Sequence, residues 1–126
     1  MNEFVPLNKL EEKLLDARRG ASPVGEFVQE LWSSLLTMPT NSEVQDDGSG
    51  FRPIIFDKLG TNMLAVFTSK ERMGHLQHLA KYCMVAQGGE VLRRMPKEYG
   101  LVVNPGLEVG FEISPSGIAE IISRFG

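Results

Sequence analysis

The sequence predicts an α+β fold: a mixed, largely antiparallel sheet with helices packed on it and two N-terminal helices leading into it. Two observations support this class. Segments with helical caps and helical spacing of apolar residues are interspersed with short apolar segments that suit strands. Some of these short segments are joined by hairpin turns and others by single helices, which favours a mixed or antiparallel sheet over a doubly wound parallel one.

Two helices are predicted in residues 1–34. Asn8 and Glu11 form a capping box for a helix that runs to about Arg19 and closes at Gly20. We expect its leucines on one face and its charged residues, Glu11 among them, around that face. Ser22-Pro23 starts the second helix. Its wide apolar stripe consists of Phe27, Val28, Leu31, Trp32 and Leu35.

The chain is then expected to become extended near residues 35–38, because Pro39 disfavours helix in the residue before it. Residues 40–50 are polar and rich in Gly, Asp and Ser, so we expect an exposed loop there. Residues 51–57 and 62–68 flank Lys58-Leu-Gly-Thr61 and are predicted to form a β-hairpin.

Thr68 and Glu71 form a second capping box, which predicts a helix to about Lys81. Residues 82–86 suit a short buried strand. Gly88-Gly89 is expected to break the chain before a short helix over residues 90–95, which Pro96 ends.

The last 27 or so residues carry the most specific pattern, a strand, a tight turn, a strand and a capped helix. In Asn104-Pro105-Gly106, proline presets φ and glycine accepts the positive φ of a type II turn. Val109, Phe111 and Ile113 then alternate with smaller or polar residues, as in a half-buried strand. Ser114 and Pro115 suit the cap and first position of the final helix.

Length and composition indicate one domain over residues 1–126, with a helical part at 1–34 and an αβ core at 35–126. The net charge of −3 argues against nucleic acid or an anionic membrane as the main partner. The first residues do not resemble a signal peptide, and no apolar run is long enough to span a bilayer. With Cys83 as the single cysteine, we expect a reducing cytoplasm.

Three segments in register resemble the SseB N-terminal domain family. They are Ala65-Val-Phe-Thr-Ser-Lys-Glu71, Gly100-Leu-Val-Val-Asn-Pro-Gly106 and Ile113-Ser-Pro-Ser-Gly-Ile118. The resemblance covers roughly residues 35–125. It implies a small bacterial cytoplasmic protein, a name linked to enhanced serine sensitivity and a type III secretion label attached through a shared name. The family has no agreed catalytic residues, so the resemblance implies none here.

The one group of side chains that suggests chemistry is His75, His78 and Cys83, with Glu71 on the same predicted helix. Histidines three apart share a helix face, and a thiolate nearby could complete a zinc site. Cys83 lies in an apolar segment, however, where packing is the favoured interpretation. We therefore expect no metal and no cofactor.

Two functional hypotheses follow. The first is a non-enzymatic protein-binding or adaptor module that uses its sheet face and the exposed turn formed by Asn104, Pro105, Gly106 and Glu108. The alternative is a small ligand- or metal-binding domain or enzyme that uses Glu71, His75 and His78.

Large, soft side chains are numerous: Phe27, Trp32, Met38, Phe51, Phe56, Met63, Met73 and Met84. They suit either an adaptable apolar binding surface or a methionine-rich core, and the core is the favoured interpretation. The partner protein is unknown, and the first two helices could also pack against a second copy in a homodimer.

Overall fold

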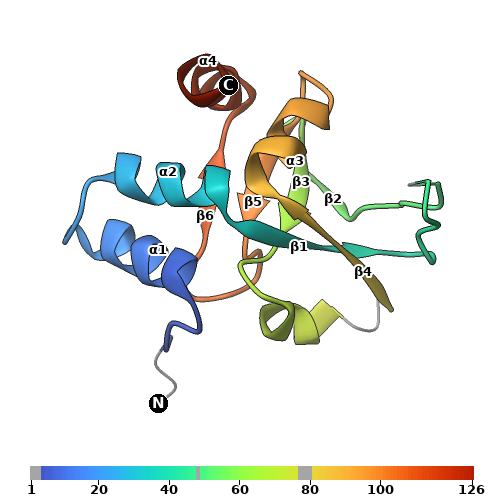
Figure 1. The fold of residues 1–126 in the computed structure, drawn as a ribbon, viewed down its shortest axis with the longest axis horizontal. Helices are drawn as coiled ribbons and strands as arrows, with labels where there is room; N and C mark the ends of the chain where they lie inside the picture. The colour runs from blue at the N-terminus through green and yellow to red at the C-terminus, as the bar shows by residue number, and fades with distance from the viewer. Residues whose placement is uncertain (1–3, 48, 77–80) are drawn as a thin grey trace.

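The structure, a computed structural model, describes residues 4–47, 49–76 and 81–126, without the side chains of His75 and Leu76. The elements follow the predicted order (Figure 1). They are α1 (Lys9–Arg19), α2 (Val24–Ser33), β1 (Leu35–Thr40), β2 (Ile55–Lys58), β3 (Thr61–Val66), the 3-10 helix η1 (Lys70–Leu76), β4 (Tyr82–Gln87), α3 (Gly88–Arg94), β5 (Gly100–Val103), β6 (Phe111–Ile113) and α4 (Pro115–Phe125).

The strands form two sheets, which confirms the α+β class. Four strands lie in the order β2-β3-β5-β6, in which only β3 and β5 run parallel, and β1 pairs with β4 in an antiparallel ribbon. Thr37 of β1 and Phe67, just after β3, exchange backbone hydrogen bonds of 2.9 and 2.7 Å. The expected single sheet is therefore two sheets that touch at this bridge.

The core lies between the four-stranded sheet and helices α1, α2, α3 and α4. Phe27 and Leu31 of α2 are fully buried, and the Phe27 ring lies 5.0 Å from that of Phe111 in β6. The core also contains Leu10, Leu14, Leu36, Met38, Leu64, Val66, Val91, Leu92, Leu101, Val103, Val109, Ile113 and Ile118. Among the described residues, no helix has the length and apolar character needed to cross a membrane.

Local capping signals are confirmed at both ends of the chain. The Asn8 side chain accepts from the Glu11 N–H at 2.8 Å, and Gly20 closes α1 with φ of 74°. The Ser114 hydroxyl accepts from the Gly117 N–H at 3.1 Å, with Pro115 as the first residue of α4. In α2 the cap is Pro23 without a side-chain bond, so the prediction of a Ser22 cap is wrong.

Three other predictions need correction. Over the described residues, the segment after Thr68 is a 3-10 helix from Lys70 to Leu76, and the Thr68 hydroxyl donates to Glu11 and does not cap this helix. The last strand begins only at Phe111, so a longer loop, residues 104–110, joins it to β5. The β4 strand is partly exposed rather than buried.

The Gly88-Gly89 pair does not break the chain but starts α3. A Cβ atom on Gly88 would overlap the Leu31 carbonyl oxygen, and one on Gly89 would lie 2.7 Å from the Trp32 ring. Glycine therefore lets α3 begin against the end of α2, where the Gly88 N–H donates to the Ser34 carbonyl at 2.8 Å. The guanidinium carbon of Arg93 in α3 also lies over the Trp32 ring, 5.0 Å from the ring centre.

Candidate functional site

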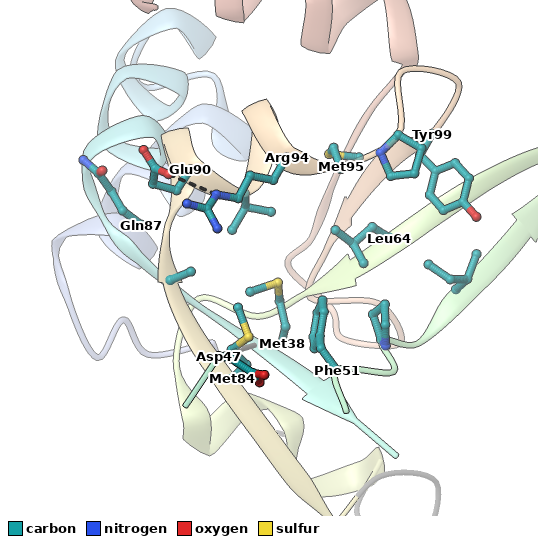
Figure 2. Close-up of a pocket in the computed structure, with 15 residues that line it drawn as sticks. Met38, Asp47, Phe51, Leu64, Met84, Gln87, Glu90, Arg94, Met95 and Tyr99 are labelled. Carbon is teal, nitrogen blue, oxygen red and sulfur yellow. Dashed lines mark ion pairs between the residues drawn. The ribbon is translucent and has the colours of Figure 1, made fainter. Parts of the chain in front are cut away.

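An open groove of about 850 Å³ lies between the β1–β4 ribbon with α3 and the β2–β3 hairpin with the segment that precedes it (Figure 2). This volume is in the range of protein binding sites. The groove is lined by Met38, Asp47, Phe51, Pro53, Ile55, Leu64, Met84, Ala86, Gln87, Glu90, Val91, Arg94, Met95, Pro96 and Tyr99.

Strand register places the groove-lining residues of the ribbon together. Met38 of β1 is the direct partner of Met84 in β4, and Ala86 lies two residues further along on the same face. Met95 follows the end of α3, so three methionine side chains reach the groove from three segments. Unbranched thioether side chains repack at low cost, which suits a surface that adapts to what it binds.

Polar groups lie at the rim of the groove. The Arg94 Nε lies 3.3 Å from Glu90 Oε2 (Figure 2). Arg93 Nη1 lies 3.0 Å from the other oxygen of the same carboxylate. The Arg94 side chain is 82% exposed, so this pair contributes little to stability. Across the groove, the Ser49 N–H donates to Asp47 and lowers the pKa of that carboxyl below its ordinary value.

The predicted turn site is not at this groove. The turn itself has the predicted form, because the Leu107 N–H donates to the Asn104 carbonyl at 3.2 Å and Gly106 has φ of 80°. Gly106 and Glu108 are exposed and Pro105 is half-buried. Asn104 is only 1% exposed, so the prediction of an exposed side chain is wrong at this position.

The Asn104 side chain belongs to a buried polar network. Its Oδ1 accepts from the Thr68 N–H at 3.1 Å, and its Nδ2 donates to Thr68 Oγ1 at 3.0 Å and to the Val109 carbonyl at 3.3 Å. These bonds hold the residue at φ of 56°, a left-handed conformation that asparagine tolerates better than most residues.

The centre of this network is the carboxylate of Glu11, which is fully buried. It accepts from the Thr68 hydroxyl at 2.6 Å, from the Leu7 N–H at 2.9 Å, and from Arg72 Nε at 3.1 Å and Nη2 at 2.8 Å. Burial raises the pKa of Glu11, but these hydrogen bonds outweigh burial and hold it below the ordinary value. The expectation that Glu11 surrounds the apolar face is therefore wrong.

Arg72 extends the network to the N-terminal segment. Its Nη2 donates to the Val5 carbonyl at 2.5 Å, and its guanidinium lies 4.1 Å from the centre of the Phe4 ring. The side chains of Glu11, Thr68, Arg72 and Asn104 are thus all hydrogen-bonded within the fold. This arrangement suits a structural role for the network, linking α1, η1 and the Asn104 turn.

The residues of the alternative site are only partly described. Glu71 is exposed, and Cys83 is half-buried against Phe67 and Met73. His78 and the His75 side chain lie outside the described residues. In the part of the chain that the structure describes, no group of three or more His, Cys, Asp or Glu side chains is placed to hold a metal ion.

Sequence reasoning missed the groove itself but found part of its lining. Met38, Phe51 and Met84 belong to the soft side chains that suit an adaptable surface, and all three line the groove. Of that group, Phe27, Met63 and Met73 are buried away from the groove, and Met38, which lines it, is itself only 2% exposed. The choice between core and surface depended on which strands diverge, and no local signal in the sequence reports that.

Comparison with known proteins identifies the family of this chain. A family model described as the SseB protein N-terminal domain matches residues 10–120, which is most of the chain. The match confirms the resemblance that the motifs indicate and extends it over the two N-terminal helices. No curated protein and no solved structure matches the chain.

Proposed function

This chain belongs to the SseB protein N-terminal domain family, and we propose that it is a non-catalytic protein-binding module that takes an apolar segment of a partner protein into the groove. The observation that carries the proposal is the distribution of polarity. The inner lining comes from methionine, aromatic and aliphatic side chains, whereas the charged groups lie at the rim.

This distribution favours a protein segment over a small polar metabolite. Sites for small molecules contain a few convergent polar groups that fix the orientation of the ligand. Here Met38, Leu64 and Val91 are the most buried lining residues, and none offers a side-chain hydrogen bond. An apolar segment needs no such bonds, because its side chains gain free energy by leaving water.

Rim charges suggest the flanks of the partner segment. Asp47, ionised at neutral pH, lies on one side of the opening, while Arg94 lies on the other side. We therefore expect a short apolar stretch with a basic residue at one end and an acidic residue at the other.

Selection from a displayed random peptide library, followed by calorimetric titration and amide chemical-shift mapping, tests the proposal. Ala86→Phe would fill the groove from β4, and Ala21→Phe, at an exposed position between α1 and α2, makes the same substitution elsewhere. We expect Ala86→Phe to weaken binding of selected peptides at least tenfold and Ala21→Phe to leave it unchanged.

The same assay examines the turn as an alternative binding surface. Glu108→Lys reverses an exposed charge on the turn. If Glu108→Lys no longer binds the selected peptides while Ala86→Phe binds them normally, the site lies at residues 104–108 and not in the groove. Shift changes confined to residues far from both surfaces would contradict both assignments.

A further inference from the structure

One edge of the β1–β4 ribbon is unpaired among the described strands. The ribbon contains β1 and β4 only; β1 also bridges to Phe67 and Pro53, whereas no described strand pairs with the outer edge of β4 (Figure 1). A strand edge with unpaired backbone groups is a template for pairing with another strand.

Hydrogen bonds on either side of the ribbon show which β4 residues face outward. The Gly88 N–H donates to the Ser34 carbonyl, so the even-numbered positions of this segment bond toward β1. In β1, the backbone groups of Thr37 bond to Phe67 and therefore point away from β4. Thr37 is the partner of Val85, so the Val85 backbone groups likewise point away from β1. The backbone N–H and carbonyl groups of Cys83 and Val85 and the N–H group of Gln87 therefore point away from β1, whereas the Gln87 carbonyl, at the N-cap of α3, accepts within that helix.

The side chains of this edge also differ from those of the other edges. β4 reads Tyr-Cys-Met-Val-Ala-Gln, without charge, proline or glycine, and Tyr82 and Val85 are 44% and 52% exposed. The edge strand β2 carries Asp57 and Lys58, and the edge strand β6 carries Glu112, which forms an ion pair with Lys58. Charges of this kind keep an edge from pairing with another chain, and β4 lacks them.

We propose that a second copy of this chain pairs its β4 antiparallel to this edge, with the two-fold axis at Val85. This register places Cys83 opposite Gln87 of the other copy, so the two Val85 residues exchange both backbone hydrogen bonds and each Gln87 N–H donates to the Cys83 carbonyl of the other copy. The paired residues themselves carry no charge: Lys81 comes just before them, and Glu90, two residues after the start of α3, is already bound by Arg93 and Arg94 of its own helix. The two-fold rotation therefore brings the exposed, uncharged side chains of the two strands together.

Apolar contact adds to the backbone pairing. Leu35 is 66% exposed and lies on the same face of the ribbon as Val85, because Leu35 and Thr37 are the partners of Gln87 and Val85. Across the axis, Val85 and Leu35 of both copies form one patch. The pairing goes beyond the proposed function and does not depend on what occupies the groove.

Sedimentation velocity over a concentration series tests the pairing. Val85→Lys places two like charges directly opposite each other at the axis, and Val24→Lys makes the same substitution at a 44% exposed position of α2. We expect wild type and Val24→Lys to dimerise with the same dissociation constant, and Val85→Lys to weaken the dimer about tenfold or more.

Hydrogen exchange in the wild type gives a second measurement that needs no variant. The amides of Val85 and Gln87 should become protected as the protein concentration rises, whereas the even-numbered amides of β4 should be protected at every concentration. A monomer at all concentrations, or a dimer that Val85→Lys leaves intact, would overturn the proposal. The first of these results would leave the edge to a strand of a different protein.

Discussion

Replacing Glu11 by glutamine tests the charge of the buried carboxylate without changing its shape. In the wild type, Arg72 donates to this carboxylate through Nε at 3.1 Å and Nη2 at 2.8 Å, and Thr68 donates its hydroxyl at 2.6 Å. The glutamine amide keeps one neutral acceptor oxygen and presents an NH₂ group where the second oxygen was. Arg72 therefore loses its counter-ion.

The structure gives the size of the effect. A hydrogen bond to a charged group contributes about 1.5–3 kcal/mol and a neutral one about 0.5–1.5 kcal/mol, so each of the two Arg72 bonds should weaken by about 1 kcal/mol. The Arg72 side chain is only 19% exposed, so water replaces little of this interaction. We expect Glu11→Gln to lower the free energy of unfolding by about 2 kcal/mol and Tm by roughly 8 °C.

The pKa of Glu11 adds a pH dependence of known sign. Because this pKa lies below the ordinary value of 4.5, the unfolded chain binds a proton at Glu11 at a higher pH than the folded chain does. The wild-type free energy of unfolding should therefore fall as pH decreases from about 4.5 toward the folded pKa. Glutamine does not titrate, so the difference between wild type and variant should shrink in this window.

Urea denaturation followed by far-UV circular dichroism, at neutral pH and in steps down to about pH 3, measures both effects. Glu12→Gln is the matched control, because Glu12 is exposed on the same helix. Equal stability of Glu11→Gln and Glu12→Gln at neutral pH would refute the reasoning. A difference between wild type and Glu11→Gln that does not change with pH would refute the assignment of the lowered pKa.

Two further substitutions test close packing and the turn. Gly88→Ala should lower the free energy of unfolding by about 3 kcal/mol or more, because its Cβ would overlap the Leu31 carbonyl. Gly25→Ala, with open space around it in α2, should raise the free energy of unfolding by about 0.5–1 kcal/mol. Thermal unfolding of the two variants measures this difference. Asn104→Ala should destabilise by about 2–4 kcal/mol through lost buried hydrogen bonds and left-handed backbone strain, and Glu108→Lys by less than about 0.5 kcal/mol. A urea midpoint for Asn104→Ala equal to that of Glu108→Lys would contradict this difference.

The element order could be predicted because its signals are local. Asn8 caps the N–H of Glu11 only three residues away, and Ser114 caps that of Gly117 at the same spacing. Lys58-Leu-Gly-Thr61 likewise determines its own hairpin, since Leu59 and Gly60 both adopt positive φ. Such interactions form within one turn or one hairpin, so the pattern of residue types reports them directly.

The roles of Glu11, Thr68 and Asn104 could not be predicted, because their partners are distant in the chain. Thr68 contacts Glu11 across 57 residues and Asn104 across 36. Each of these residues also has a sufficient local explanation: a capping box, a helix cap and a turn. At Thr68, the hydrogen bond to Glu11 replaces the expected helix cap. Glu11 and Asn104 stay in their helix and turn and make additional hydrogen bonds to distant residues.

The groove was missed for a related reason. It lies between the β1–β4 ribbon and the β2–β3 hairpin with its flanking segments, which meet at the isolated bridges Thr37–Phe67 and Thr40–Pro53. A single sequence shows which segments are strands but not which pairs separate. Residue type alone therefore favours the core for Met38 and Met84, and it is their pairing in the ribbon that places both side chains along the groove.

The distance in sequence between Glu11 and Arg72 has a consequence during synthesis on the ribosome. The two residues are 61 positions apart, so at about 5–20 residues per second the counter-ion of Glu11 emerges roughly 3–12 s after Glu11 itself. Until then the nascent first helix carries a solvated carboxylate on the face that the native protein buries. Docking of that helix before Arg72 has emerged would bury the Glu11 carboxylate without its counter-ion, which is unfavourable.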